Sequence, residues 1–161
     1  MSYSIRYAEF SDLPRILEIY EEARQYMRTH GNPNQWWGGY PTREMLESDI
    51  AKEQLYVCEE DNHIYAAFVM AVGEDPTYQV IEGAWKNDLP YVTLHRIAST
   101  GEKRGMVDEI VRWAFSQHAN VRGDTHELNL PMRNAFVRND FAYCGTIWVD
   151  DGTPRMAFHK V

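Results

Sequence analysis

The sequence predicts a single α/β domain built on a mixed sheet with one parallel portion. Two strand-like runs joined by a short polar turn occupy residues 54–72, which indicates an antiparallel hairpin. Strands and helices alternate through the second half, a pattern typical of parallel pairing. The 161 residues contain no repeat, linker or low-complexity tract, so residues 1–161 are expected to form one domain.

The first half is expected to run from a strand through two helices to the hairpin. Residues 4–7 form the first strand, and a long helix follows with Ser11 as its N-cap and Gly31 just past its end. Apolar residues at three- and four-residue spacing give that helix one buried face. The next elements are a short helix at 42–52 and hairpin strands at 54–59 and 63–72.

The second half is expected to begin with a loop at 73–89 and a strand at 91–98. A helix then starts after Gly105, because apolar residues recur at helical spacing from Met106 to Phe115. The remaining elements are a strand at 121–127, a helix at 129–138 and two strands at 141–149 and 155–160.

Composition and charge exclude several function classes. The formal net charge is −8, whereas non-specific nucleic-acid binding depends on clustered Lys and Arg. No apolar run approaches the ~20 residues of a membrane span. Cys58 and Cys144 lack CxxC spacing and no secretory leader precedes them, which favours a reduced, cytoplasmic setting. The six histidines show neither HxH nor HExxH spacing, so no metal site is expected.

Large aromatic residues gather in the glycine-rich stretch at 34–41. Trp36, Trp37 and Tyr40 lie there, and Trp85 lies in the later loop. The rings either cap the core or form the wall of a substrate pocket, since binding residues concentrate on loops held by a rigid scaffold. Under the second interpretation these four aromatic residues are candidate substrate-binding residues.

The strand, the Gly101–Gly105 loop and the following helix together form a candidate phosphate site. Unpaired N–H groups and the helix dipole at a helix start attract anions, and Lys103 and Arg104 add charge. The alternative is a tight strand-to-helix turn without a ligand. The loop matches neither GxxxxGK[ST] nor GxGxxG, which excludes the P-loop and dinucleotide-binding patterns.

Residues 94–99, this loop and the helix through Trp113-Ala114 resemble the acetyl-CoA-binding core of the GNAT N-acetyltransferases. Residues 124–129 and 141–145 are similar to the C-terminal half of bacterial small-molecule members, and the element order agrees along the whole chain. The resemblance implies the acyl-CoA N-acyltransferase fold. That fold is a mostly antiparallel sheet of six to seven strands, splayed between strands four and five, with helices on both faces.

The resemblance also implies how acetyl-CoA binds. Its pantetheine arm would lie in the splay and bond to the backbone of Ile97, Ala98 and Ser99. Asn129 matches an asparagine that commonly contacts the cofactor. The pyrophosphate would lie on the amides of the loop and helix start, at Lys103, Arg104, Gly105, Met106 and Val107.

The sequence departs from the family pattern in two places. Aligned on Gly105, the pattern [QR]xxGx[GA] keeps only its central glycine, and Asp108 and Glu109 follow in the first helical turn. Carboxylates there would oppose a pyrophosphate if they faced it. Many members also carry a tyrosine that protonates the leaving thiolate, and Phe136 occupies that position here.

Three side chains are candidates for proton transfer. His95 and His126 could act as the base, because histidine accepts a proton near neutral pH. Tyr143 could replace the missing acid, and for each residue the alternative is a structural role. The predicted function is acetyl transfer from acetyl-CoA to a primary amine of a small molecule or peptide. The alternatives are a catalytically degenerate CoA- or ligand-binding protein of the same fold and an interaction domain. A homodimer is compatible with all three, since many relatives dimerise.

Overall fold

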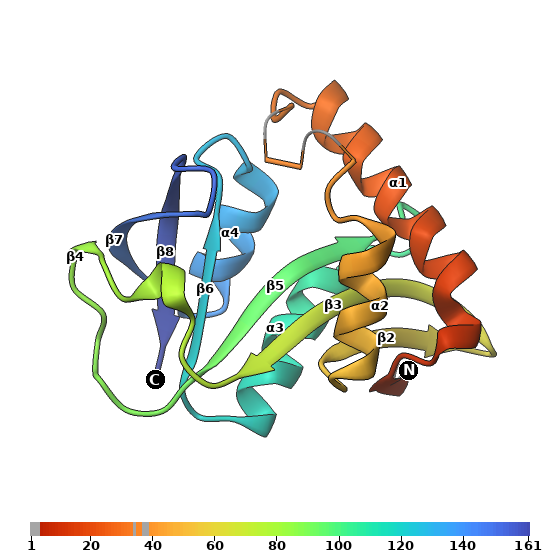
Figure 1. The fold of residues 1–161 in the computed structure, drawn as a ribbon, viewed down its shortest axis with the longest axis horizontal. Helices are drawn as coiled ribbons and strands as arrows, with labels where there is room; N and C mark the ends of the chain where they lie inside the picture. Colours follow the sequence, from red (N-terminus) through yellow and green to blue (C-terminus); the bar gives the residue numbers. More distant parts are fainter. Residues whose placement is uncertain (1–3, 34, 37–38) are drawn as a thin grey trace. The chain divides into compact units, whose positions relative to one another are not determined.

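A computed structural model describes residues 4–33, 35–36 and 39–161 (Figure 1). In this described part, eight strands follow the order β1-β2-β3-β5-β6-β8-β7-β4, and four α-helices accompany them. The expected mixed, mostly antiparallel sheet is confirmed. The chain divides into two compact units, unit 1 up to Met70 with Arg96–Val107, and unit 2 with Ala71–His95 and Asp108–Val161.

Unit 1 contains the strand, the two helices and the hairpin that were predicted for the first half. β1 pairs antiparallel with β2, and β2 with β3. The Thr100 amide donates to the Tyr65 carbonyl at 2.9 Å, which ties the end of β5 to β3. The elements are β1 (Ser4–Tyr7), α1 (Leu13–Thr29), α2 (Arg43–Ala51), β2 (Leu55–Glu60), most of β3 (His63–Val72) and the second half of β5 (Val92–Ser99).

The start of α1 differs from the prediction. Ser11 lies inside a 3-10 turn, η1 (Phe10–Asp12), and Asp12 occupies the N-cap position of the α-helix. The Glu9 amide donates to the Asp12 carboxylate at 2.8 Å as part of a reciprocal capping box. The box caps the 3-10 turn at Glu9, and α1 then starts from Asp12, so the prediction of Ser11 as N-cap was wrong.

Unit 2 contains the antiparallel strands of the second half. β6 pairs with β8, and β8 with β7. Its core includes Val121, Phe141, Ile147 and Phe158, all fully or nearly fully buried. The elements are η2 (Pro76–Tyr78), β4 (Glu82–Gly83), the first half of β5, most of α3 (Met106–Gln117), β6 (Val121–Thr125), α4 (Leu130–Arg138), β7 (Ala142–Trp148) and β8 (Pro154–Lys160).

The 73–89 segment is more ordered than the loop that was predicted. It contains η2 and the two-residue strand β4, which raises the strand number to eight in the described part of the chain. Gly83 of β4 pairs with Gly145 of β7, and a Cβ atom on either glycine would overlap the partner's backbone. Such a short, glycine-containing strand has no alternating pattern, so the sequence carries no signal for it.

Among the helices in the described residues, none has both the length and the apolar composition that crossing a membrane requires.

Candidate active site

The parallel ladder between β5 and β6 is short. Its registered pairs are Val92–Val121, Thr93–Arg122 and Leu94–Gly123. The next residues along the two strands are His95 and Asp124, both in unit 2. Because side chains alternate along a strand, both point to the face opposite that of Leu94 and Gly123. The ladder therefore ends where two titratable side chains share one face of the sheet.

His95 is bound to a carboxylate. Its Nε2 lies 2.8 Å from Asp75 Oδ2. An ionised carboxylate only accepts hydrogen bonds, so Nε2 is the donor, and in the neutral ring Nδ1 is the nitrogen that holds the lone pair. No hydrogen-bond partner contacts Nδ1 among the residues that the structure describes. Burial alone would raise the pKa of Asp75, but hydrogen bonds from His95 and Thr77 outweigh it and lower the pKa to about 2. His95 is thus oriented as a proton acceptor.

Asp124 forms a second polar pair on the same face. The hydroxyl of Tyr78, which is 2% exposed, donates to Asp124 Oδ1 at 2.5 Å. Burial raises the pKa of Asp124, against the opposing effects of His95 and Arg155. Burial and the Asp124 charge raise the pKa of Tyr78 well above its usual range. The two carboxyl groups beside His95 are therefore pushed toward opposite protonation states.

His126 and Tyr143 occupy less suitable positions. Nδ1 of His126 accepts a hydrogen bond from the Leu128 amide at 3.1 Å, which uses the lone pair that a base would need. Burial, followed by the nearby Arg155, also lowers the pKa of His126. Tyr143 is 56% exposed on β7, and its ring contacts Phe158 at 5.9 Å between centroids. His95 is the candidate whose partners suit proton transfer.

Phe136 is a core residue. It is 1% exposed, and its ring stacks on Phe158 at 4.8 Å and packs against Phe141 at 4.9 Å. A Cβ atom at Gly123 would lie only 2.7 Å from Phe136 Cζ. The missing side chain at Gly123 leaves room for this ring, which explains a glycine inside β6.

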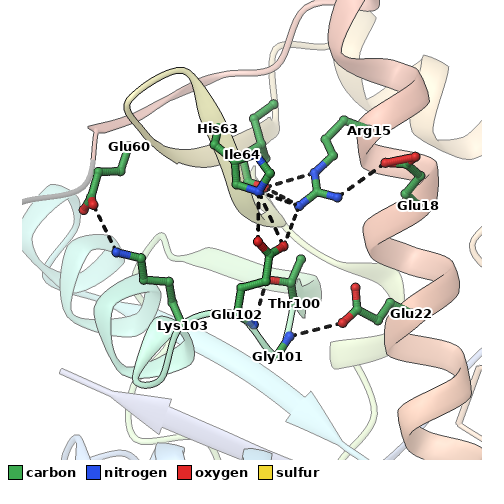
Figure 2. A network of polar contacts seen from close by, with 10 residues as sticks. All are labelled: Arg15, Glu18, Glu22, Glu60, His63, Ile64, Thr100, Gly101, Glu102 and Lys103. Atoms are coloured by element: carbon green, nitrogen blue, oxygen red, sulfur yellow. Dashed lines mark hydrogen bonds and ion pairs between the residues drawn. The ribbon is translucent and has the colours of Figure 1, made fainter.

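The loop before α3 carries a network of charged contacts in unit 1, shown in Figure 2. Arg15 Nη2 donates to Glu102 Oε1 at 2.9 Å, and His63 Nε2 lies 3.1 Å from Glu102 Oε2. The Gly101 amide donates to Glu22 Oε1 at 3.2 Å. One loop amide therefore already binds a carboxylate, which is the kind of group that a phosphate site attracts.

In this loop the charge of Lys103 is already paired, whereas the space beside Gly105 is open. Lys103 Nζ lies 3.0 Å from Glu60 Oε1 (Figure 2). It also lies 5.2 Å from the centroid of the Tyr65 ring. Its charge is thus largely neutralised within unit 1. Gly105 has a φ of 79°, and no heavy atom of the described residues lies within 4 Å of the place its Cβ would take. The backbone of the loop is therefore open at Gly105.

Asp108 and Glu109 are both paired with cations. Arg138 Nη2 donates to Asp108 Oδ2 at 2.8 Å, and the Asn139 side-chain Nδ2 donates to Oδ1 at 2.8 Å. The bond from Arg138 lowers the pKa of Asp108. Glu109 accepts from Arg112 at 2.9 Å. These pairs reduce the electrostatic conflict with an anion that the sequence suggested.

The backbone of β5 departs from the extended conformation at Arg96. Arg96 has a φ of 49°, in the left-handed region that non-glycine residues seldom adopt. Its carbonyl accepts from the Tyr20 hydroxyl at 2.6 Å, and its Nη1 donates to the buried Asp49 at 3.0 Å. These contacts hold the unusual conformation immediately before Ile97, Ala98 and Ser99, of which Ala98 is buried and the other two are half-buried.

The aromatic loop packs around Arg96 in unit 1. Trp36 is 9% exposed, with its ring centroid 5.6 Å from that of Tyr20 and 6.4 Å from that of Tyr40. The Arg96 guanidinium lies 5.6 Å from the centroid of the Tyr40 ring. Trp37 falls outside the described residues. The contacts of Trp36 favour the interpretation that this ring caps the core.

Trp85 and Asn129 have defined structural contacts in unit 2. The Trp85 indole N–H donates to the Tyr78 carbonyl at 3.0 Å, and the Arg122 guanidinium lies 4.3 Å from the ring centroid. Asn129 is the N-cap of α4 and accepts from the Met132 amide at 3.2 Å. Both residues thus have structural roles, whatever ligand contacts they add.

Sequence reasoning missed Asp75, Tyr78 and Asp124 in unit 2 and Arg96 in unit 1. Asp75 and Tyr78 lie in the segment taken for a loop, and nothing local marks them. Asp124 did carry a signal, because a carboxyl group inside a buried strand is rare unless it has a partner.

Comparison with known proteins identifies the fold and the family. No family model and no curated protein matches the chain. A GNAT-family acetyltransferase structure from Streptococcus agalactiae is 30% identical, with a TM-score of 0.91 over 99% of this chain and 95% of that chain. A GNAT-family structure from Listeria monocytogenes is 16% identical, with a TM-score of 0.73 over 98% and 94%. The aminoglycoside acetyltransferase AAC(6')-Ib in complex with coenzyme A is 18% identical, with a TM-score of 0.67 over 99% and 95%.

The last two similarities concern the fold alone, whereas the first combines high structural similarity with 30% identity over nearly the full length of both chains. The chain therefore belongs to the GNAT family of acetyltransferases.

Proposed function

We propose that the chain, acting as one domain over residues 1–161, transfers the acetyl group of acetyl-CoA to a primary amine of a small molecule or peptide. The observation that carries this proposal is the His95–Asp75 pair at the end of the β5–β6 ladder. An amine must be neutral to attack a thioester, and its extra proton must leave during transfer. His95 Nδ1 accepts that proton, while Asp75 orients the ring and stabilises the imidazolium.

The acetyl donor binds mainly through backbone groups. The pantetheine arm bonds to the backbone of Ile97, Ala98 and Ser99, and the pyrophosphate contacts amides between Lys103 and Val107. The open Gly105 and the first turn of α3 support this assignment, since amides in a first helical turn lack intrahelical acceptors. Because Glu60 holds Lys103, the amides contribute more than that side chain does. Asn129 adds a further contact.

The acceptor amine binds close to His95, the side chain that accepts its proton. The carboxylate of Asp75 and the net charge of −8 favour a cationic acceptor over an acidic one. Trp36, Trp37, Tyr40 and Trp85 remain candidate substrate-binding residues on the sequence pattern alone.

A non-catalytic CoA-binding protein is the second candidate, and Phe136 favours it. The usual position of the thiolate-protonating tyrosine here holds a ring without an acidic proton, buried against Phe158. Under this candidate, acetyl-CoA binds but no amine accelerates thiol release.

Two measurements test the proposal and separate the candidates. Isothermal titration with acetyl-CoA should give saturable binding, and binding of desulfo-CoA serves as a control for the thiol. Thiol release measured across a panel of diamines, aminoglycosides and peptide N-termini should then identify an acceptor. Absence of heat at high micromolar acetyl-CoA contradicts both candidates, whereas binding without turnover on any amine supports the second.

A further inference from the structure

We propose that Asp124 is the catalytic general acid of this reaction and that Tyr78 positions it. This inference rests on the proposed acetyl transfer, and it assigns the role that Phe136 cannot perform. Loss of the C–S bond releases a thiolate whose conjugate thiol has a pKa near ~8.5, so a proton donor at the sulfur accelerates that step.

The first observation that supports this assignment is the position of Asp124 in the sheet. It is the first residue of β6 beyond the last registered pair with β5, and His95 is the corresponding residue of β5. The two residues directly follow that pair on the same face, and the charge of His95 lowers the pKa of Asp124, so acid and base are near neighbours. Phe136 packs on the opposite face, against Gly123. The acid is thus supplied from the other side of β6.

The hydrogen bonds of Asp124 leave one oxygen for a transferable proton. Tyr78 occupies Oδ1, and no other hydrogen-bond or ion-pair partner of the carboxyl is found in the described part of the chain. Arg155, on β8, donates instead to Thr153 and to the Pro154 carbonyl. The carboxyl therefore lacks the direct cation that would fix it in the ionised form.

Four titratable or charged groups surround this carboxyl: Tyr78 from η2, Asp75 just before it, His95 from β5 and Arg155 from β8. Burial raises the Asp124 pKa most strongly, and the charge of Asp75 raises it further. His95, the Tyr78 hydrogen bond and Arg155 lower it, and the net direction is upward. A neutral Asp124 beside an ionised Asp75 is the arrangement that separates an acid from a base.

Protons gained and lost by each group balance over one catalytic cycle. The amine nitrogen bonds to the acetyl carbon as its proton moves to His95 Nδ1. The C–S bond then breaks, and its electron pair remains on sulfur, which takes the proton from Asp124. His95 finally returns its proton to the Asp124 carboxylate, directly or through water. The products are the acetylated amine and CoA thiol, and both side chains regain their starting states.

The protonation state of Asp124 can be measured without any substrate. An infrared difference spectrum between the wild type and Asp124→Asn should contain a protonated-carboxyl C=O band at pH 7. Asp150→Asn, which removes an exposed carboxylate of unit 2, should give only the ionised signal. If Asp124 also gives only the ionised signal at pH 7, the acid role is overturned, while acetyl transfer itself stands.

Changing the leaving group tests the role in turnover. With acetyl-CoA, Asp124→Asn should lower kcat about 100-fold, and Tyr78→Phe about tenfold. With 4-nitrophenyl acetate, whose phenolate departs without protonation, both losses should shrink below about threefold. Asp150→Asn should match the wild type with both donors. Equal losses with the two donors would assign Asp124 a structural role and overturn the proposal. If Asp124→Asn does not fold, the same comparison is made with Tyr78→Phe: an equal loss of kcat with acetyl-CoA and with 4-nitrophenyl acetate overturns the proposal.

Discussion

The loop before α3 and the cluster around His95 use charged groups in different ways. In the loop, the ion pairs of Glu102 are partly exposed to solvent, and Arg15 and His63 share one carboxylate. In the cluster, Asp75 and Asp124 are largely shielded from solvent, with Asp75 bound by His95 and Thr77 and Asp124 by Tyr78. Exposed pairs are screened and contribute little, whereas shielded groups change their proton affinity. We therefore expect the cluster to determine chemistry and the loop to determine donor affinity.

The largest expected effect is on catalysis. His95→Gln should lower kcat about 100- to 1,000-fold, because the variant lacks the proton acceptor. The dissociation constant for acetyl-CoA should stay within twofold, which titration calorimetry can check. His126→Gln is the matched control and should keep kcat within about twofold. A His126 variant as inactive as the His95 variant would reverse the assignment of the base.

The second largest effect is expected on the stability of the fold at acid pH. Burial lowers the pKa of His159 from 6.5 to about 4, and Arg122 and Lys86 add to this. The unfolded chain therefore binds a proton more readily, so stability is fully present above pH 6.5 and falls as the pH drops toward 4. The difference corresponds to about 3 kcal/mol. Urea unfolding between pH 4 and 7 should show this slope, and His159→Gln should flatten it. An unchanged slope in the variant would contradict the prediction.

The next effect concerns the stability cost of replacing a glycine in each unit, Gly123 in unit 2 and Gly105 in unit 1. Gly123→Ala should destabilise the protein by about 1–3 kcal/mol, because the new methyl group meets the buried Phe136 ring. Gly105→Ala meets no atom but has an unfavourable positive φ, so it should cost about 1 kcal/mol. Thermal unfolding measures both, and a larger loss at Gly105 than at Gly123 would contradict this order. The Gly105 variant should also bind acetyl-CoA more weakly.

The smallest effect is expected in the loop's ion pairs. Glu102→Gln removes a negative charge beside the proposed pyrophosphate site and should tighten acetyl-CoA binding up to about fivefold at low salt. Added salt should reduce the gain, because exposed charges are screened. Glu18→Gln removes another exposed partner of Arg15 and should leave the affinity unchanged. Tightening that is equal in both variants would indicate a general charge effect rather than a local one.

The sequence by itself determined the local structure. The predicted strands 4–7 and 63–72 match β1 and β3 at both ends, and the helix expected after Gly105 begins at Met106. Period-2 and period-3.6 patterns, caps and turns act between near neighbours, so they can be read directly from the chain. His95 was a candidate for the same reason, because its strand and its type of side chain are local properties.

Only the tertiary structure decided which side chains work together. It joined His95 to Asp75 across 20 residues and Tyr78 to Asp124 across 46. It also neutralised Lys103 with Glu60, placed Phe136 in the core and set the left-handed conformation at Arg96. Hydrogen-bond partners, burial and strand register depend on contacts between distant segments. A local pattern specifies an element and its faces, but the protonation state of a side chain depends on what the fold packs against it.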